Sequence, residues 1–392
     1  FNNKVNKSIS LLDQYIVNED YEGYDPYDTL NSSIPFHYFG KWTQILAIQF
    51  QKRNPINIRK FIGIKKFRST KGMGLLLSAY LNLYLYQNDK KHIPKIKKIK
   101  NWLLNNQSYY NNHICWGYDF PYATISEKVD KKFPTVIHHS YIMKSLFQYY
   151  LIFKDELVKK TLIKCEEFLL KDLNINKYKE GISFSYHPEV YNGCCYNASM
   201  HAANCLAIVY HFKKDEKLLS LIYDSLNFIV SMQQKDGSWN YSFANYGGAE
   251  RKQIDFHQGF ILESFYEIKK ILNKTEDSWE KAINKGLDFY FKNQFDPYGK
   301  SFWRLPKKYP IDIHNQAQGI ITFKKYRGYN KSYDDFYKKI AIWTIDNMQS
   351  NRKGNFYYRK YKLFTNKIPY IRWSQSWMLL ALSESIIVDN KQ

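Results

Sequence analysis

A repeat of about 60 residues constrains the fold of this chain more than any other feature. Four positions inside predicted helices, Ala198, Gly259, Ala317 and Trp377, follow one another at intervals of 61, 58 and 60 residues. Each interval holds two helices and their loops, and periods of this size are typical of stacked helical hairpins. The sequence therefore predicts hairpins that share one continuous core.

Hydrophobic periodicity predicts two helices in each repeat. The first helices are expected near residues 92–106, 156–171, 216–233, 277–293 and 333–349, and the second near 138–153, 197–212, 257–272, 315–327 and 373–388. A weaker sixth pair is expected near 42–53 and 72–86. Six hairpins can close into a ring with the second helices inside. The predicted fold is an all-α (α/α)6 toroid, one domain over residues 1–392, with residues 1–41 as an N-terminal sealing or lid segment.

A glycine followed by an aromatic residue recurs after the first helices. Gly237 precedes Trp239, and Gly299 precedes Trp303. We expect each glycine to end a helix or tighten a turn at positive φ. The aromatic side chain is then placed to fill the gap between neighbouring hairpins.

Polar residues open the predicted second helices at a similar point in each repeat. If these helices form the inner ring, their N-terminal ends surround one mouth, and the sequence predicts a functional site there. The openings are His138-His139, Tyr196-Asn197, Asp255-Phe256-His257, His314-Asn315-Gln316 and Arg372-Trp373-Ser374-Gln375.

Two resemblances follow from these patterns. Residues 233–239, QQKDGSW, resemble the QxxDGxW-type repeat of terpene cyclases and protein prenyltransferases. Over roughly residues 100–388 the chain resembles the toroids of six-hairpin glycosidases, polysaccharide lyases and sugar epimerases. Residues 254–263, 311–318 and 371–378 are similar to uncharacterised toroid proteins of bacterial surface-polysaccharide biosynthesis. The resemblance implies the toroid fold and a role in making or modifying a bacterial surface polysaccharide.

The chain also departs from these families. It lacks the DxDD acid motif of terpene cyclases, which argues against a cyclase. Asp255, His257 and His314 mimic the three zinc ligands of protein prenyltransferases, although cysteine is missing from the middle place. A zinc-dependent prenyltransferase-like enzyme therefore stays an alternative, while our main interpretation assigns no metal and no cofactor.

A sugar-binding cleft requires flat aromatic faces, side-chain amides for hydroxyl groups, and a proton carrier at the reactive bond. The predicted mouth supplies all three. The catalytic candidates are His257, His314, Asp255, Tyr196 and His139. The substrate-binding candidates are Trp116, Trp239, Trp303, Trp373, Arg251, Arg372, Asn197, His201, Gln258, Asn315, Gln316 and Gln318.

A uronate-containing glycan would suit such a site. Arg372 or Arg251 could neutralise the sugar carboxylate and acidify the adjacent C–H bond. A histidine or Tyr196 could then remove or return that proton, which leads to epimerisation or β-elimination. Hydrolysis requires two facing carboxylates instead, for which Asp255 and Asp312 are candidates. A noncatalytic toroid that binds a glycan or a protein is a further alternative.

Composition bears on the partners. The chain carries 58 Lys and Arg against 36 Asp and Glu, a formal charge of +22, which favours an anionic oligosaccharide or polysaccharide and allows peripheral association with a membrane surface. Lysine-rich composition without a binding role explains the charge equally well. No recognised nucleic-acid module organises the basic residues, so no nucleic-acid partner is expected. No apolar stretch predicts a transmembrane segment, and five cysteines without a disulfide-like pattern favour the cytoplasm.

Overall fold

The core of the protein is a closed ring of six inner helices. The computed structural model describes residues 1–87, 89–124, 128–189, 193–245 and 249–387. Each inner helix contacts the next, and the last contacts the first. The inner helices are α3 (Thr70–Gln87), α5 (Val136–Phe153), α7 (Tyr196–Lys213), α9 (His257–Leu272), α11 (Ile313–Lys325) and α13 (Trp377–Ile386), the last preceded by the π-helical turn η5 (Ile371–Ser376).

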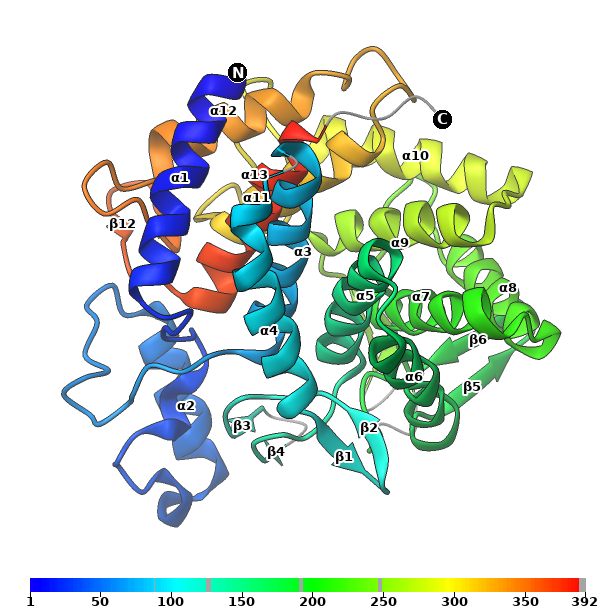
Figure 1. Cartoon of the computed structure of the whole chain (residues 1–392), viewed down its shortest axis with the longest axis horizontal. Helices are drawn as coiled ribbons and strands as arrows, with labels where there is room; N and C mark the ends of the chain where they lie inside the picture. The colour runs from blue at the N-terminus through cyan, green and yellow to red at the C-terminus, as the bar shows by residue number, and fades with distance from the viewer. Residues whose placement is uncertain (88, 125–127, 190–192, 246–248, 388–392) are drawn as a thin grey trace.

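A second layer of helices surrounds this ring, and Figure 1 shows α1, α8, α10 and α12 at the periphery of the molecule. Each outer helix packs against one inner helix or two neighbouring ones. The chain therefore folds as an (α/α)6 toroid, which confirms the predicted fold class. The outer helices are α1 (Asn2–Asn18), α4 (Ile93–Asn105), α6 (Glu156–Lys164), α8 (Glu216–Ser231), α10 (Asp277–Gln294) and α12 (Phe336–Met348).

The two layers differ in their sequences because they differ in burial. The outer helix α4 buries Ile96, Ile99 and Leu103, which are three and four residues apart, and exposes Lys97 and Lys98. The inner helix α7 is buried at every position from Tyr196 to Val209, because helices surround it on all sides. Four alanines and one serine lie among the 18 residues of α7 and allow this close packing.

The sixth hairpin differs from the prediction. Residues 42–53 do form a helix, α2 (Gly40–Arg53), but it packs on the 3-10 turns η1 (Asp28–Asn31) and η2 (Phe36–Phe39) and not in the outer layer. The N-terminal helix α1 takes the outer place beside α13. It buries an apolar stripe that ends with Leu12 and Ile16, whereas the buried face of α2 includes Gln44 and Gln51.

The two ends of the toroid have different connections. Turns from an inner to the following outer helix are short, with Lys154, Lys214 and Asn273 in the left-handed conformation, and Asp155 and Asp215 cap the next helix. Connections from an outer to the following inner helix are long, and they contain short strands that the sequence does not predict. These are β1 (Ser108–Tyr110), β2 (His113–Cys115), β3 (Tyr122–Ala123), β4 (Lys128–Val129), β5 (Ile175–Tyr178), β6 (Gly181–Phe184), β7 (Cys194–Cys195), β8 (Ser242–Asn245), β9 (Ala249–Arg251), β10 (Ile311–Asp312), β11 (Arg359–Lys360) and β12 (Thr365–Asn366).

Antiparallel pairing joins neighbouring connections to one another. Cys194 pairs with Phe243 between β7 and β8, and Ile311 pairs with Lys360 between β10 and β11. The long loops therefore hold each other in place at this end of the ring.

The glycine-aromatic turn behaves as expected at Gly237, whereas Trp303, which follows Gly299, is only partly buried. Gly237 has φ of +92°, and a Cβ added there would lie 2.4 Å from the carbonyl oxygen of Lys285. The side chain of Trp239 is fully buried against Gly286, and its Nε1 donates a 2.8 Å hydrogen bond to the carbonyl of Ile229. The turn thus joins one hairpin to the next, as predicted. Among the residues described, no helix has the length and hydropathy that crossing a membrane requires.

Candidate active site

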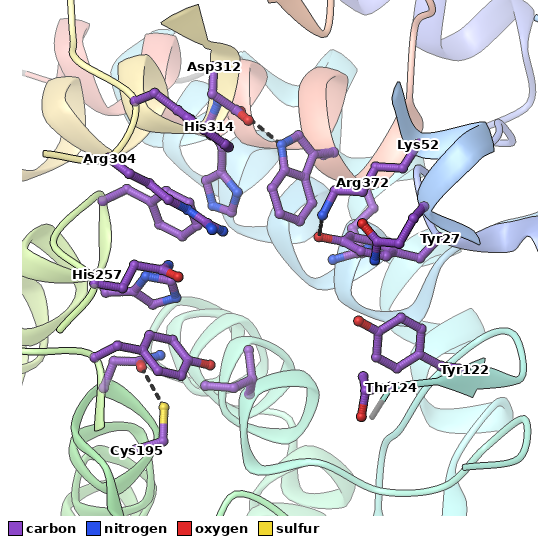
Figure 2. Close-up of a pocket in the computed structure, with 18 of the residues that line it drawn as sticks. Tyr27, Lys52, Tyr122, Thr124, Cys195, His257, Arg304, Asp312, His314 and Arg372 are labelled. Carbon is purple, nitrogen blue, oxygen red and sulfur yellow. Dashed lines mark hydrogen bonds between the residues drawn. The ribbon is translucent and has the colours of Figure 1, made fainter. Parts of the chain in front are cut away.

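A cavity of about 1010 Å³ opens at the end of the ring where the long connections lie. The first turn of every inner helix contributes a polar side chain to its lining, which confirms that the polar helix openings meet at one mouth. Figure 2 shows His257, Arg304 and His314 on one side of the cavity and Tyr27, Lys52 and Tyr122 on the other. The six first-turn residues are Lys71, His138, Asn197, His257, His314 and Arg372.

Asp255 and His257 form a hydrogen-bonded pair at the start of α9. His257 lines the cavity, and its Nδ1 lies in a short contact with Oδ1 of the almost fully buried Asp255. Burial opposes ionisation of Asp255, but His257 and Arg304 outweigh it and hold the pKa of that carboxyl below its usual value. An ionised Asp255 fixes the proton of His257 on Nδ1, which leaves Nε2 as the proton acceptor.

His314 lies on the same wall and is held by aromatic rings. Phe256 stacks on His257 at 4.3 Å between ring centroids and on His314 at 4.4 Å. Neither ring nitrogen of His314 has a hydrogen-bond partner among the described residues. Burial, together with the cations of Lys71 and Arg372, lowers the pKa of His314 well below its usual value. Burial thus favours the uncharged form of His314, which lies in the cavity wall with both ring nitrogens buried.

His138 provides a third imidazole of the same kind. Its Nδ1 lies 2.8 Å from Oγ1 of Thr135, while its Nε2 has no partner among the described residues. Burial, and then Arg372 and Lys71, lowers its pKa well below the usual value. His138 belongs to a predicted helix opening but is not among the catalytic candidates that the sequence indicates.

Lys71 lines the cavity but is not among the site residues that the sequence predicts. It is the second residue of α3, it is 4% exposed, and its Nζ lies 4.3 Å from the ring centroid of Tyr141. No carboxylate of the described residues pairs with it within 4 Å. Burial, and then the cations of Arg372 and Lys144, lowers its pKa well below the usual value. Extending the repeat to the sixth inner helix would have found it, since His314 and Arg372 are also second in their helices.

The charged lining is strongly cationic. Among the described residues, Asp312 is the one carboxylate that lines the cavity, and Nε of Arg359 binds it at 2.7 Å. Two further bonds occupy Asp312, from Nε1 of Trp373 and from the backbone N–H of His314. The lining cations are Lys52, Arg53, Lys71, Arg251, Arg304, Arg359 and Arg372.

Arg372 and Arg251 line the cavity as predicted, but they differ in their partners. Arg372 donates to both carboxylate oxygens of Asp25 at 2.6 and 2.8 Å, so the N-terminal segment holds it in place. Arg251 donates to Oε1 of Gln253 and lies over the ring of Tyr241. Arg251 is therefore the arginine with more freedom to meet an anionic ligand.

The predicted aromatic faces divide into two pairs. Trp303 and Trp373 line the cavity. Trp116 and Trp239 are fully buried in the core, and the Nε1 of each bonds a carbonyl of the preceding outer helix. The expectation that this second pair faces a ligand is wrong, because both side chains fill the gap between hairpins.

With one exception, the predicted amide side chains hydrogen-bond to other groups of the protein and do not line the cavity. Gln258 binds the backbone N–H and carbonyl of Trp239, and Gln316 binds the backbone N–H of Ser301 and the carbonyl of Gly299. Asn315 binds loop carbonyls and Gln318 binds Glu263, while Asn197 alone lines the cavity. These amides satisfy buried backbone and side-chain groups, so the structure does not bring them to the site.

Three further candidates also lie in the core. Tyr196, His139 and His201 are at most 1% exposed, and none lines the cavity. Burial raises the pKa of Tyr196 and lowers the pKa of His139 to about 3. His139 packs between Trp116 and Phe168. These three side chains are therefore packed in the core, where they do not contact a ligand in the cavity.

The three residues that mimic prenyltransferase zinc ligands do not converge. In the described part of the chain, no group of three His, Cys, Asp or Glu side chains is placed to hold a metal ion. The ring of Phe256 stacks on both imidazoles, and Asp255 is bonded to His257. The zinc-dependent alternative requires Asp255, His257 and His314 to converge on one ion, and this expectation is wrong.

No family model and no curated protein matches this sequence. Solved structures do match its fold. An unsaturated glucuronyl hydrolase from Streptococcus agalactiae aligns with a TM-score of 0.64 at 15% identity, covering 98% of this chain and 92% of that one. An unsaturated glucuronyl hydrolase specific for heparin aligns with a TM-score of 0.62 at 11% identity, covering 98% and 96%. Cellobiose 2-epimerase from Bacillus thermoamylovorans aligns with a TM-score of 0.61 at 11% identity, covering 81% and 88%. At these identities the likeness shows the (α/α)6 toroid fold.

Proposed function

We propose that this protein is a carbohydrate-active enzyme that transfers a proton next to the carboxylate of a uronate residue in an anionic glycan. The outcome is epimerisation or β-elimination. One observation carries the proposal: the Asp255–His257 pair lies at a cavity whose charged lining is cationic except for one neutralised carboxylate. The role is the assembly or modification of a bacterial surface polysaccharide in the cytoplasm.

The first step uses His257 as the general base. Its Nε2 takes the proton from the carbon that bears the carboxylate, and the electron pair of the C–H bond moves into the carboxylate. Negative charge then accumulates on the carboxylate oxygens. Arg251 offsets this charge, and Lys71 does so as well because an anionic substrate beside it favours its protonated form.

The second step decides the product. In epimerisation, an acid on the opposite face of the sugar returns a proton to the same carbon. In β-elimination, the electron pair forms a carbon–carbon double bond, the glycosidic oxygen on the next carbon leaves, and that oxygen takes a proton. We assign the relay of the proton in either case to His314 and His138, because both line the cavity and their free ring nitrogens have no partner among the described residues.

Hydrolysis by two carboxylates has less support. Such hydrolases place an acid and a base or nucleophile on either side of the glycosidic bond. In the described lining, Asp312 is the one carboxylate, and Arg359, Trp373 and a backbone N–H occupy it. The similar structures include unsaturated glucuronyl hydrolases and a cellobiose 2-epimerase, which agrees with a uronate substrate and with proton transfer.

Substitution of His257 tests the proposal, and the chain offers a matched control. His113 pairs with Asp172 at 2.8 Å outside the cavity, with side-chain exposures of 18% and 1% against 16% and 1% for His257 and Asp255. On a panel of uronate-containing and neutral glycans, we expect His257→Gln to lower turnover by about 100-fold or more. His113→Gln should leave turnover within about twofold, and both variants should melt at similar temperatures.

Two results would contradict the proposal. Equal loss of activity in both variants would indicate that histidine–aspartate pairs serve stability alone. If the wild-type protein binds anionic glycans in a salt-sensitive way, without turnover and with unchanged affinity in His257→Gln, the noncatalytic alternative is correct.

A further inference from the structure

Helix α2 buries polar side chains and exposes large apolar ones, which is the reverse of the pattern in the rest of the molecule. Its buried positions are Gln44, Ile48 and Gln51. Its opposite face carries Trp42, Leu46 and Phe50, four residues apart, which are 66%, 68% and 65% exposed. We call this second face the α2 stripe. An amphipathic helix normally buries its apolar face, so this helix is built for an apolar environment that the toroid does not supply.

The surrounding segment extends the apolar surface. Phe39 just before α2 is 60% exposed, and Ile56 and Phe61 after it are 70% and 87% exposed. Figure 1 shows α2 at the edge of the molecule, outside the two layers of the toroid. Single exposed apolar side chains are common, but several in one segment mark an interaction surface.

The charge of this segment indicates its partner. Residues 33–66 contain no Asp or Glu. A protein partner could match either charge, whereas an anionic bilayer attracts a cationic segment and accepts Trp, Leu and Phe at its interface. Arg59 is buried in an ion pair with Asp28, and Lys52 bonds Tyr27. The exposed cationic residues of this segment are Lys41, Arg53, Lys60, Lys65 and Lys66.

The position of α2 relates this surface to the cavity. Four other residues of α2 line the cavity, Ile45, Gln49, Lys52 and Arg53. A membrane in contact with the stripe would therefore lie beside the cavity wall. A glycan carried on that membrane could reach the first turns of the inner helices.

We propose that the α2 stripe docks the protein on an anionic lipid bilayer, with Trp42, Leu46 and Phe50 inserted at the interface between headgroups and acyl chains. Docking adds a partner to the proposed function and does not depend on it, because the stripe does not line the cavity. Loss of docking therefore leaves turnover of a soluble oligosaccharide unchanged.

Vesicle flotation with the full chain tests this proposal. We expect the wild-type protein to float with phosphatidylcholine vesicles that contain phosphatidylglycerol, and to stay behind with phosphatidylcholine alone. The triple variant Trp42→Ser, Leu46→Ser, Phe50→Ser should lose at least about tenfold in vesicle affinity. The control is Tyr109→Ser, Leu157→Ser, Tyr298→Ser, which removes side chains that are 63%, 61% and 78% exposed on other elements. It should float like the wild type.

Insertion of the stripe is read out separately by fluorescence. Anionic vesicles should shift the tryptophan emission of the wild-type protein to the blue, and Trp42→Phe should abolish the shift while flotation remains. A shift that survives in Trp42→Phe would overturn insertion of the stripe.

Three other outcomes would overturn the proposal. The first is flotation that the stripe variant and the control variant lose equally. The second is an absence of vesicle binding by the wild-type protein. The third is a concentration-dependent dimer that Trp42→Ser, Leu46→Ser, Phe50→Ser disperses, which would assign the stripe to a second copy of the chain.

Discussion

At the scale of single residues, neighbours on one inner helix serve different purposes. His257 lines the cavity, whereas Gln258 next to it binds the backbone of Trp239. Successive residues on a helix point about 100° apart. In a polar opening of two or three residues, one side chain therefore faces the cavity while its neighbour faces the protein. The sequence shows that such an opening exists. It cannot show which member faces the cavity, because that depends on how the neighbouring loop packs.

Lys71 gives a prediction in which stability and function change in opposite directions. Its pKa is lowered in the folded protein, mainly by burial. The unfolded chain therefore binds more protons than the folded one between the lowered pKa and the ordinary value near 10.4, and the lysine destabilises the fold at neutral pH. We expect Lys71→Met to raise the free energy of unfolding at pH 7 by about 1–3 kcal/mol.

The gain should shrink as the pH rises towards the ordinary lysine pKa, because the unfolded chain also loses its proton there. Urea unfolding from pH 7 to pH 10 measures it. The same variant should raise KM for an anionic glycan by about tenfold. A loss of stability at pH 7 with unchanged KM would show that Lys71 is a structural residue.

At the scale of elements, the glycine-aromatic turn is the part of the fold that the sequence predicts best. At Gly237 its signals are local: a glycine at positive φ, and an aromatic residue two positions later, Trp239, that fills the gap between hairpins. The same interpretation is wrong for Trp303 after Gly299, because Trp303 lines the cavity. The short strands of the mouth are not predicted. Their pairing, such as Ile311 with Lys360, joins segments from different repeats, and each is too short to show an alternating pattern.

Alanine substitutions at two glycines with the same φ allow the cost of backbone strain to be measured separately from the cost of a packing clash. Gly237 and Gly328 both have φ of +92°. A Cβ on Gly237 would lie 2.4 Å from the carbonyl oxygen of Lys285, whereas a Cβ on Gly328 would have no heavy atom within 4 Å. We expect Gly328→Ala to cost about 1–2 kcal/mol through φ strain alone.

Gly237→Ala should cost at least about 2 kcal/mol more, because the contact forces one hairpin away from the next. Chemical unfolding of the two variants measures the difference. Equal costs would show that the turn does not fix the packing between hairpins.

At the scale of the whole molecule, the sequence predicts a ring but not how it closes. The repeat length, the order of the helices and the common mouth all follow from periodicity. The last outer helix does not, because α1 lies at the opposite end of the chain from α13. The hydrogen bond from Ser8 to Gln349 spans 341 residues. No local pattern connects such distant segments, and the helical propensity of residues 42–53 offers a nearer but incorrect partner.

Closure of the ring makes α1 essential for stability. Leu12 on α1 is fully buried, whereas Val17 on the same helix is 39% exposed. We expect Leu12→Ala to lower the free energy of unfolding by about 2–5 kcal/mol, and Val17→Ala to change it by about 0.5 kcal/mol or less. Thermal unfolding checks both values. A small effect of Leu12→Ala would show that α1 is dispensable for the toroid.

The central claim is that the cavity transfers a proton at the carbon next to a uronate carboxylate. Incubation of the protein with uronate-containing oligosaccharides in D₂O, followed by NMR and mass spectrometry of substrate and products, tests it directly. The account predicts deuterium on that carbon of an epimerised product, or loss of its hydrogen with formation of an unsaturated uronate, and neither in His257→Gln. Cleaved sugars that retain the original hydrogen, with one water added per cut, would contradict the account and identify a hydrolase.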